Sequence, residues 1–341
     1  MQKILIFDST LRDGNHAVHH QLNENQIATY AAAADSADIP IVMVGHGNGI
    51  GASSIQVGES YLSDIEMINS ARNKLLKSKL GIYAMPGFAT INRDLMRAID
   101  AGVDVVCIGS HCTETDTTQR HIEYVQQREK KAYGNLMMTH MASKEILVEE
   151  CLKSESYGVD GIIIMDSAGA YLPKDVTEKI SALVAALDVP IGFHAHNNLG
   201  LAVANSIAAV EAGATILDCS ARGFSAGAGN AQIEVLVAVL EKMGYYTGIN
   251  LYKILDASDI AEEILMEVIP STKSVNIVSG LAGVFSGFVK HVERISRQYN
   301  VDSRDVFFEL GHKKVVAGQE DIIIEVAMNL ADERRKKMGG R

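Results

Sequence analysis

The chain has 341 residues, of which 47% are hydrophobic and 21% are charged, with only 5 prolines. This composition supports a large buried core and excludes a chain that is disordered over most of its length. The formal net charge of −11 argues against a nucleic-acid or anionic-membrane surface, because phosphate groups bind to a positive field. The 4 cysteines show no C-x-x-C spacing, and no apolar run is long enough for a membrane helix or a secretion signal. We therefore expect a cytoplasmic protein that acts on a small molecule, with no nucleic-acid and no membrane partner.

Eight short apolar runs alternate with helical segments before residue 250. The runs begin near residues 4, 41, 80, 103, 134, 160, 190 and 215. Helical patterning fills the gaps, for example over 23–39, 63–77, 92–102 and 202–213. Because the runs are apolar on consecutive residues, they suit parallel strands that are covered on both faces. The alternation predicts an α/β fold, a (β/α)8 TIM barrel, with an open doubly wound sheet as the alternative.

The alternation stops after residue 250. The segments 251–267, 276–299, 303–311 and 320–336 have the patterning of helices. We therefore predict a barrel domain over 1–250 and a C-terminal helical domain over 251–341.

Histidine and aspartate follow most of the predicted strands, at the end of a barrel where active sites lie. Taken one at a time, His46, His111 and His140 are better explained by packing and hydrogen bonding beneath a site than by a direct functional role. Taken together, these polar residues mark a functional rim. Six of the eight runs contribute to it: Asp8 with Arg12, Asp13 and His16, then His46, His111, His140, Asp166, and the pair His194 and His196.

The most specific local feature is the pair His194 and His196 on the seventh run. Residues two apart on a strand point to the same face, so two imidazoles there can share one cation. Asp13, just after the first run, adds a carboxylate. A set of two histidines and one carboxylate suits Mn²⁺, Co²⁺, Fe²⁺ or Zn²⁺ and leaves coordination positions open for substrate.

The glycine-rich segment 220–230 follows the last strand. We favour a loop that packs against the metal site, with Asn230 reaching a metal ligand or the metal itself. A phosphate-binding loop is a second interpretation, although no lysine follows in Walker spacing. A simple turn into the next helix is the third.

Three separated motifs, DSTLRDG, HAHNN and GAGNA, resemble the metal-dependent superfamily that includes 3-hydroxy-3-methylglutaryl-CoA lyase and isopropylmalate synthase. Within it, the segments TLRDGNHAVHHQ, VGHGNG, HCTETD, LMMTHMAS, MDSAGA, GAGNAQIEV and GHKKVVAGQED are similar to the 4-hydroxy-2-oxovalerate aldolases over nearly the whole chain. The resemblance implies cleavage of 4-hydroxy-2-oxopentanoate, or a close 4-hydroxy-2-oxo acid, to pyruvate and acetaldehyde or another short aldehyde.

The resemblance also implies roles for single residues. Asp13, His194 and His196 would hold the divalent metal, most often Mn²⁺, with Co²⁺, Mg²⁺, Fe²⁺ and Zn²⁺ as alternatives. Arg12 would stabilise the enolate formed on cleavage, and His16 would remove the hydroxyl proton. His19 and His20 compete with His16 for this role. The expected substrate contacts are Arg12, Asp13, Ser167, His194 and Phe285.

Three positions depart from the family pattern. Phe285 stands where these aldolases carry a tyrosine that faces the substrate, and Ala317–Gly318 replaces a pair of glycines associated with an aldehyde passage. HAHNN replaces the more usual HAHHN. The resemblance therefore does not predict two properties of this chain, namely the stereochemistry at C4 of the substrate and the transfer of the aldehyde to a partner.

Family resemblance further implies that the helical domain completes the active site and contacts an acylating acetaldehyde dehydrogenase around a homodimer core. That partner would carry the NAD, since this chain has no G-x-G-x-x-G after its first strand. Two other functions stay open at this point. One is Claisen condensation of an acyl-CoA with a 2-oxo acid, and the other is a barrel that binds a 2-oxo acid or a partner without turnover.

Overall fold

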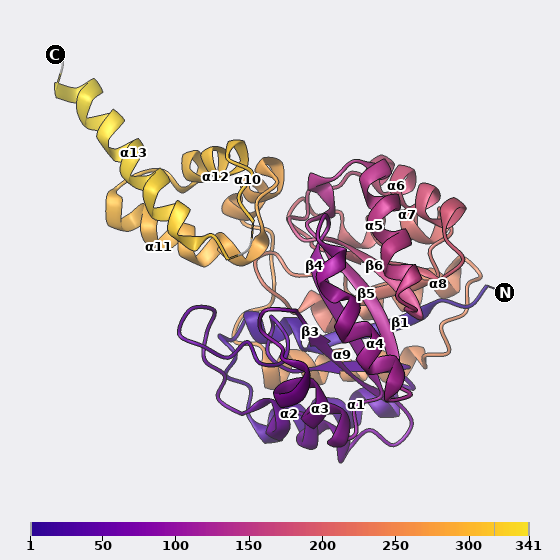
Figure 1. Ribbon diagram of the computed structural model, residues 1–341. Helices are drawn as coiled ribbons and strands as arrows, with labels where there is room; N and C mark the ends of the chain where they lie inside the picture. Colours follow the sequence, from indigo (N-terminus) through magenta and orange to yellow (C-terminus); the bar gives the residue numbers. More distant parts are fainter. Residues whose placement is uncertain (1, 317, 340–341) are drawn as a thin grey trace.

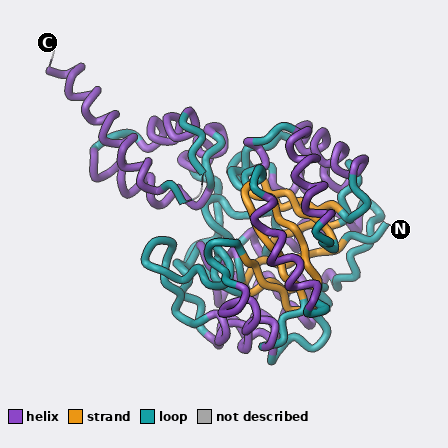
Figure 2. Tube along the Cα trace, viewed as in Figure 1, coloured by secondary structure: helices purple, strands orange, loops and turns teal. Residues whose placement is uncertain are grey.

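A closed barrel of eight parallel strands forms the centre of the computed structural model, which describes residues 2–316 and 318–339 (Figure 2). Each strand pairs with its neighbours in sequence order, and β1 pairs with β8 to close the ring. All eight predicted strands are confirmed, and the open sheet is excluded. The strands are β1 (Leu5–Leu11), β2 (Ile41–Val44), β3 (Lys79–Ala84), β4 (Val105–His111), β5 (Lys131–Met137), β6 (Gly161–Asp166), β7 (Ile191–Ala195) and β8 (Ile216–Cys219).

Helices follow the strands and cover the outside of the barrel, as the purple tubes around the orange strands of Figure 2 show. The first begins where the sequence predicts, because the Asn23 side chain accepts a hydrogen bond from the Gln26 amide and the Gln26 side chain accepts one from the Asn23 amide. The barrel helices are α1 (Glu24–Ser36), α2 (Asp64–Arg72), α3 (Met96–Asp100), α4 (Gln119–Gln127), α5 (Lys144–Ser156), α6 (Pro173–Ala186), α7 (Ala202–Glu211) and α8 (Ile233–Lys242).

The strands separate two hydrophobic layers. One lies between the strands and the helices, and the other fills the barrel interior with side chains such as Phe7, Val105 and Ile163. On β7, Phe193 and Ala195 belong to the outer layer, so the alternate residue His194 faces the interior. Because His196 is two residues further along, both histidines of the pair point toward the barrel axis.

In the described residues, five α-helices follow the barrel, but the first of them belongs to the barrel's core. Helix α9 (Leu251–Leu265) packs against α1 and α8, and its buried Ile254 and Leu265 join the barrel's outer hydrophobic layer. A separate core holds the remaining helices together, and Figure 1 shows them in orange and yellow beside the barrel. They are α10 (Ser274–Ala282), α11 (Val289–Tyr299), α12 (Ser303–His312) and α13 (Glu320–Gly339), which we call the appendage.

The prediction of a continuous helix over 276–299 is wrong. Helix α10 ends at Ala282 because Gly283 adopts the left-handed conformation, with φ of +67°, and caps it. A short 3-10 turn, Ser286–Phe288, then leads into α11. The break turns the segment around Phe285 toward the barrel.

Ala317, expected to narrow an aldehyde passage, lies outside the described residues; the neighbouring Gly318 has a φ of +94°. Across the described ranges, none of the helices combines the length and the apolarity needed to cross a bilayer.

Candidate metal centre

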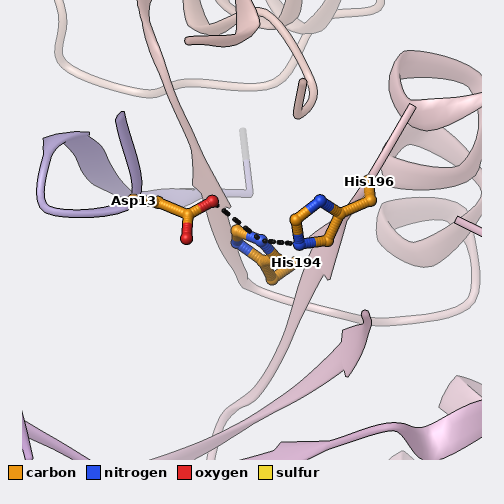
Figure 3. A group of neighbouring side chains, drawn as sticks. All are labelled: Asp13, His194 and His196. Atoms are coloured by element: carbon orange, nitrogen blue, oxygen red, sulfur yellow. Dashed lines mark hydrogen bonds and ion pairs between the residues drawn. The ribbon is translucent and has the colours of Figure 1, made fainter. Parts of the chain in front are cut away.

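Three side chains from distant parts of the sequence meet at the C-terminal end of the barrel. Asp13 begins the short 3-10 helix after β1, whereas His194 lies on β7 and His196 directly follows it. Asp13 Oδ2 lies 3.9 Å from His194 Nε2, and His194 Nε2 lies 3.4 Å from His196 Nε2 (Figure 3). All three residues are at most 5% exposed.

These residues fit a divalent cation. Their ligand atoms lie within 4.8 Å of one another, and no other set of three metal-ligating side chains does so in the parts of the chain that the structure describes. The two distances above are shorter than about 4.2 Å, the greatest separation of two ligands that each lie about 2.1 Å from one ion. Burial and the neighbouring His194 lower the pKa of His196 to about 3, so its ring is neutral at pH 7 and offers a lone pair.

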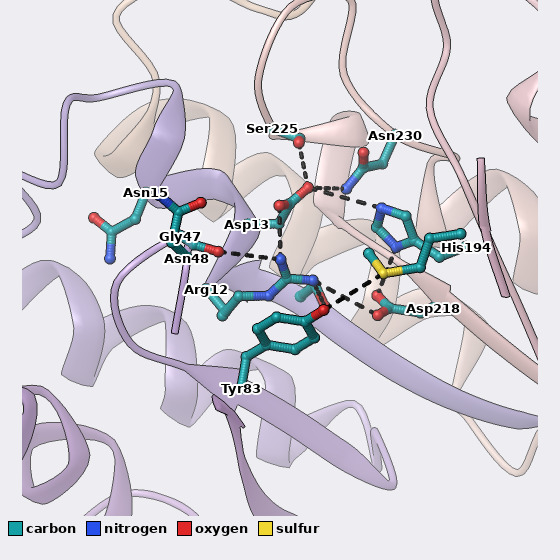
Figure 4. A network of polar contacts seen from close by, with 12 residues as sticks. Arg12, Asp13, Asn15, Gly47, Asn48, Tyr83, His194, Asp218, Ser225 and Asn230 are labelled. Atoms are coloured by element: carbon teal, nitrogen blue, oxygen red, sulfur yellow. Dashed lines mark hydrogen bonds and ion pairs between the residues drawn. The ribbon is translucent and has the colours of Figure 1, made fainter. Parts of the chain in front are cut away.

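Asp13 is held in place through both carboxylate oxygens (Figure 4). Oδ1 accepts a hydrogen bond of 2.8 Å from Arg12 Nη1, and Oδ2 accepts one of 2.7 Å from Asn230 Nδ2 and another from the Ser225 hydroxyl. Burial alone would raise the pKa of Asp13, but Arg12 and the nearby imidazoles hold it below its usual range. The carboxylate is therefore charged and fixed in orientation.

The Arg12 guanidinium lies between two carboxylates in the barrel interior. Besides Asp13, it faces Asp218, with 3.7 Å between Nη2 and Oδ2, and it donates to the Ser9 hydroxyl at 3.2 Å. Its central carbon lies 4.9 Å from the centre of the Tyr83 ring. Burial alone would lower the pKa of Arg12, but Asp13 and Asp218 raise it above its ordinary value. Arg12 therefore carries a desolvated positive charge beside the candidate metal ligands.

Two family models match consecutive parts of the chain. The HMGL-like model covers residues 3–261 and the DmpG-like communication domain covers residues 270–332. A 4-hydroxy-2-oxovalerate aldolase from Pectobacterium atrosepticum is 58% identical over 97% of this chain and 96% of its own length. Another, from Spirochaeta aurantia, is 57% identical over 96% of each chain.

The chain belongs to the 4-hydroxy-2-oxovalerate aldolase family. Membership makes it a carbon–carbon lyase of the class II aldolase type and confirms the resemblance drawn from the motifs. Solved structures with lower identity support the fold. An N-terminal domain from Bacteroides vulgatus superposes with a TM-score of 0.73 at 22% identity, over 86% of this chain and 97% of that one. The carboxyl transferase domain of Rhizobium etli pyruvate carboxylase gives 0.81 at 16% identity, over 97% and 61%.

His16, His19 and His20 are the candidates for the proton-transfer role. Each of them has different surroundings. His16 lies against the backbone of Gly47, where an added Cβ would fall 2.4 Å from its Nε2. The His20 ring stacks on the His46 ring at 3.6 Å, and its Nδ1 accepts from the Gly47 amide at 3.4 Å. His19 is exposed, and its Nε2 lies 3.1 Å from Lys290 Nζ. His16 is the one whose pKa responds to the charges of Asp13 and Arg12.

A cleft of about 1070 Å³ lies between the barrel and the appendage and leads to these residues. His16 and Ser225 line it from the barrel, and Phe285 lines it from the appendage. Ser167, expected to bind substrate, is buried, and its hydroxyl accepts from the Met138 amide at 2.9 Å. The hydroxyl proton of Ser167 is free of that bond and can still be donated.

The remaining residues of the predicted rim make structural contacts. Asp8 accepts from the Tyr30 hydroxyl, and Asp166 accepts from the amides that follow β6. His111 contacts Thr113, and His140 Nε2 lies 2.9 Å from the Gly283 carbonyl oxygen in the appendage. These residues support the rim without joining the metal group.

The sequence reasoning missed three site residues, namely Tyr83, Asp218 and Ser225. Asp218 Oδ1 lies 3.3 Å from His194 Nδ1, an ion-pair distance at which the carboxylate charge acts on the imidazole of a candidate ligand. Alternation along β8 could have identified it, since Ile216 faces the barrel interior and Asp218 is two residues further. Ser225 carries no such signal, because its loop has no regular period.

We expect Ser225→Ala to weaken metal affinity about 10-fold, because the hydroxyl that helps to fix Asp13 Oδ2 is removed while every ligand stays. Isothermal titration of the chelator-treated protein with Mn²⁺ measures this change. Ser206→Ala is the matched control, since the buried Ser206 hydroxyl bonds only its own helix, at Ala202 O. Equal affinity in the Ser225 variant and the wild type would refute the role of this contact.

Proposed function

We propose that this chain cleaves 4-hydroxy-2-oxopentanoate, or a close 4-hydroxy-2-oxo acid, into pyruvate and acetaldehyde or another short aldehyde. The observation that carries the proposal is the buried group of Asp13, His194 and His196 beside the Arg12 guanidinium. With a divalent cation, the formal charges of this group, Arg12 and Asp218 included, leave one net positive charge. That charge complements the carboxylate of a 2-oxo acid.

In this proposal Asp13, His194 and His196 hold the cation, which is Mn²⁺, with Co²⁺, Mg²⁺, Fe²⁺ and Zn²⁺ as alternatives. When bound, the cation supplies a Lewis acid that polarises the 2-oxo group of the substrate. Asn230 fixes Asp13 through its Nδ2 atom. Its buried Oδ1 atom, which has no hydrogen-bond partner among the described residues, gives it the means to contact the cation as well.

Two side chains of the protein, His16 and Arg12, assist separate steps of the reaction. His16 takes the proton of the C4 hydroxyl, the C3–C4 bond breaks, and C4 becomes the carbonyl carbon of the aldehyde. The electron pair of that bond moves to C3 and forms the enolate of pyruvate. Arg12 stabilises the enolate oxygen, a contribution of about 3 kcal/mol for a buried, fixed donor. A proton from water added at C3 completes pyruvate, and His16 releases the proton that it took to solvent.

In this proposal the substrate is recognised by the buried Ser167 hydroxyl and by Phe285, which lines the cleft from the appendage. We assign a hydrogen bond with the substrate to Ser167 and an apolar contact to Phe285, whose ring lies 5.8 Å from that of Phe288. Phenylalanine cannot donate a hydrogen bond, so the Phe285 side chain itself contributes shape only.

The test follows two products in one preparation. The Mn²⁺-reconstituted protein is incubated with 4-hydroxy-2-oxopentanoate and longer homologues, and pyruvate is measured. A parallel sample receives an acyl-CoA and a 2-oxo acid, and free thiol is measured. We expect pyruvate and no thiol. Thiol release would assign Claisen condensation, and the absence of both products would assign binding without turnover.

We also propose that the appendage binds an acylating acetaldehyde dehydrogenase and that the barrels form a homodimer core. The match of residues 270–332 to a communication domain supports the first of these assignments. The division at residue 250 stays a prediction. The packing of α9 against α1 and α8 favours a boundary after Leu265 instead, because α9 shares the barrel's core. Co-elution of the two proteins from a sizing column tests the interaction, and separate elution at micromolar concentration would contradict it.

A further inference from the structure

One buried amide joins the histidine segment of the barrel to the appendage. Asn198 lies two residues after His196 and is fully buried. Its Oδ1 atom accepts a hydrogen bond of 2.9 Å from the Ser286 hydroxyl, and its Nδ2 atom donates at 3.3 Å to the Asn276 carbonyl oxygen. Ser279 Oγ lies 3.5 Å from the same Nδ2 atom. These three partners lie on α10 and the turn that follows it, and each is at most 2% exposed.

Two glycines pack closely against Asn198, where a larger residue would collide with it. A Cβ added to Gly169 would come within 2.8 Å of Asn198, and one added to Gly280 would come within 3.1 Å. These glycines belong to two different segments, the loop after β6 and helix α10. The close approach of three segments therefore depends on small residues packed against a single amide.

The same junction reaches the appendage side of the cleft and the loop after β6. The Ser286 amide donates a hydrogen bond of 3.2 Å to the carbonyl oxygen of Ser167. Phe285, the preceding residue, lines the cleft that His16 lines from the other side. A shift of Ser286 would therefore move Phe285 relative to Ser167 and to the segment that carries His196.

We propose that Asn198 is a positioning residue that acts through Ser286. It fixes the position of Phe285, on the appendage side of the cleft, relative to the candidate metal ligands. The inference rests on the proposed function, because Phe285 is assigned to substrate binding. Asn198 touches neither the metal ligands' donor atoms nor the reacting atoms in this account. Its substitution therefore acts on substrate affinity and leaves the metal affinity unchanged.

The test uses Ser286→Ala, Asn198→Ala and the double variant. We expect KM for 4-hydroxy-2-oxopentanoate to rise about 5- to 10-fold in each single variant, the effect of one lost hydrogen bond. We expect kcat and the Kd for Mn²⁺ to change by less than about 2-fold, since the reacting groups stay in place. KM of the double variant should not exceed that of Asn198→Ala, because both substitutions remove the same contact.

Asn276→Ala is the matched control. Its side chain accepts from the Lys273 amide at the start of α10, whereas Asn198 is bound through the Asn276 backbone carbonyl, which alanine retains. We expect this variant to lose thermal stability and keep its KM within about 2-fold. A KM in Ser286→Ala equal to the wild-type value, additive effects in the double variant, or a weakened Kd for Mn²⁺ would each overturn the proposal.

Hydrogen exchange distinguishes failure of this inference from failure of the proposed function. If the wild type releases no pyruvate, the proposed function fails, and amide exchange over residues 274–288 still tests the junction. We expect faster exchange there in Ser286→Ala than in the wild type. Unchanged exchange would refute the junction whatever the substrate is.

Discussion

Asp13→Asn is expected to abolish tight metal binding and to lower the rate of pyruvate release about 1000-fold or more. An amide is a weak ligand compared with a carboxylate, and the substitution removes the charge that faces Arg12 at 2.8 Å. Ser225 and Asn230 both donate to Oδ2, so an amide nitrogen placed there would meet two donors. Titration calorimetry with Mn²⁺ and a pyruvate assay on the same sample measure both effects.

Asp218→Asn is the matched control for this substitution. Asp218 also faces Arg12 and His194, but it is not one of the three candidate ligands. We expect it to retain a bound ion with an affinity about 10- to 100-fold lower, as when a residue that orients a ligand is lost. The assignment of Asp13 as a ligand fails if Asp13→Asn binds one ion as tightly as the wild type.

His16→Ala is expected to lower kcat about 100- to 10,000-fold while the Kd for Mn²⁺ stays unchanged. Burial and, more weakly, the Arg12 charge lower the pKa of His16, although Asp13 opposes the shift. A base must be neutral to accept a proton. The lowered pKa keeps His16 neutral to a lower pH than a free imidazole, whose pKa is about 6.5. The acid limb of the kcat profile should therefore lie below that value.

His20→Ala separates His20 from His16 as the candidate base. The His20 ring stacks on His46 and accepts from the Gly47 amide, so its loss should cost stability more than turnover. Stopped assays of pyruvate release over a pH range, made with both variants, identify which histidine is the base. Loss of turnover in His20→Ala alone, with His16→Ala active, would reverse the assignment.

Most of the fold is predictable because parallel strands buried on both faces leave continuous apolar runs. Each of the eight runs became a strand. The pattern failed at Gly283, since an apolar repeat continues across it and only its positive φ ends α10. It could not show that α9 belongs to the barrel's core, because packing against α1 depends on partners more than 200 residues away.

The three candidate ligands could be picked out from short motifs, whereas the side chains that hold Asp13 in place could not. His194 and His196 share a face because they are two residues apart, and Asp13 follows the first strand. The contact of Asn230 with Asp13 agrees with the interpretation of its loop as packing against the metal site. Ser225 and the Asn198–Ser286 contact join distant segments with no local pattern, so only the three-dimensional structure reveals them.

Joint titration of metal and activity tests the central claim most directly. The chelator-treated protein is titrated with Mn²⁺ by calorimetry, and pyruvate release from 4-hydroxy-2-oxopentanoate is measured at each step. We predict one ion per chain and a rate that rises in proportion to the occupied fraction. A full rate before any ion is added, or an occupied site with no pyruvate released, would contradict the assignment of this chain as a metal-dependent aldolase.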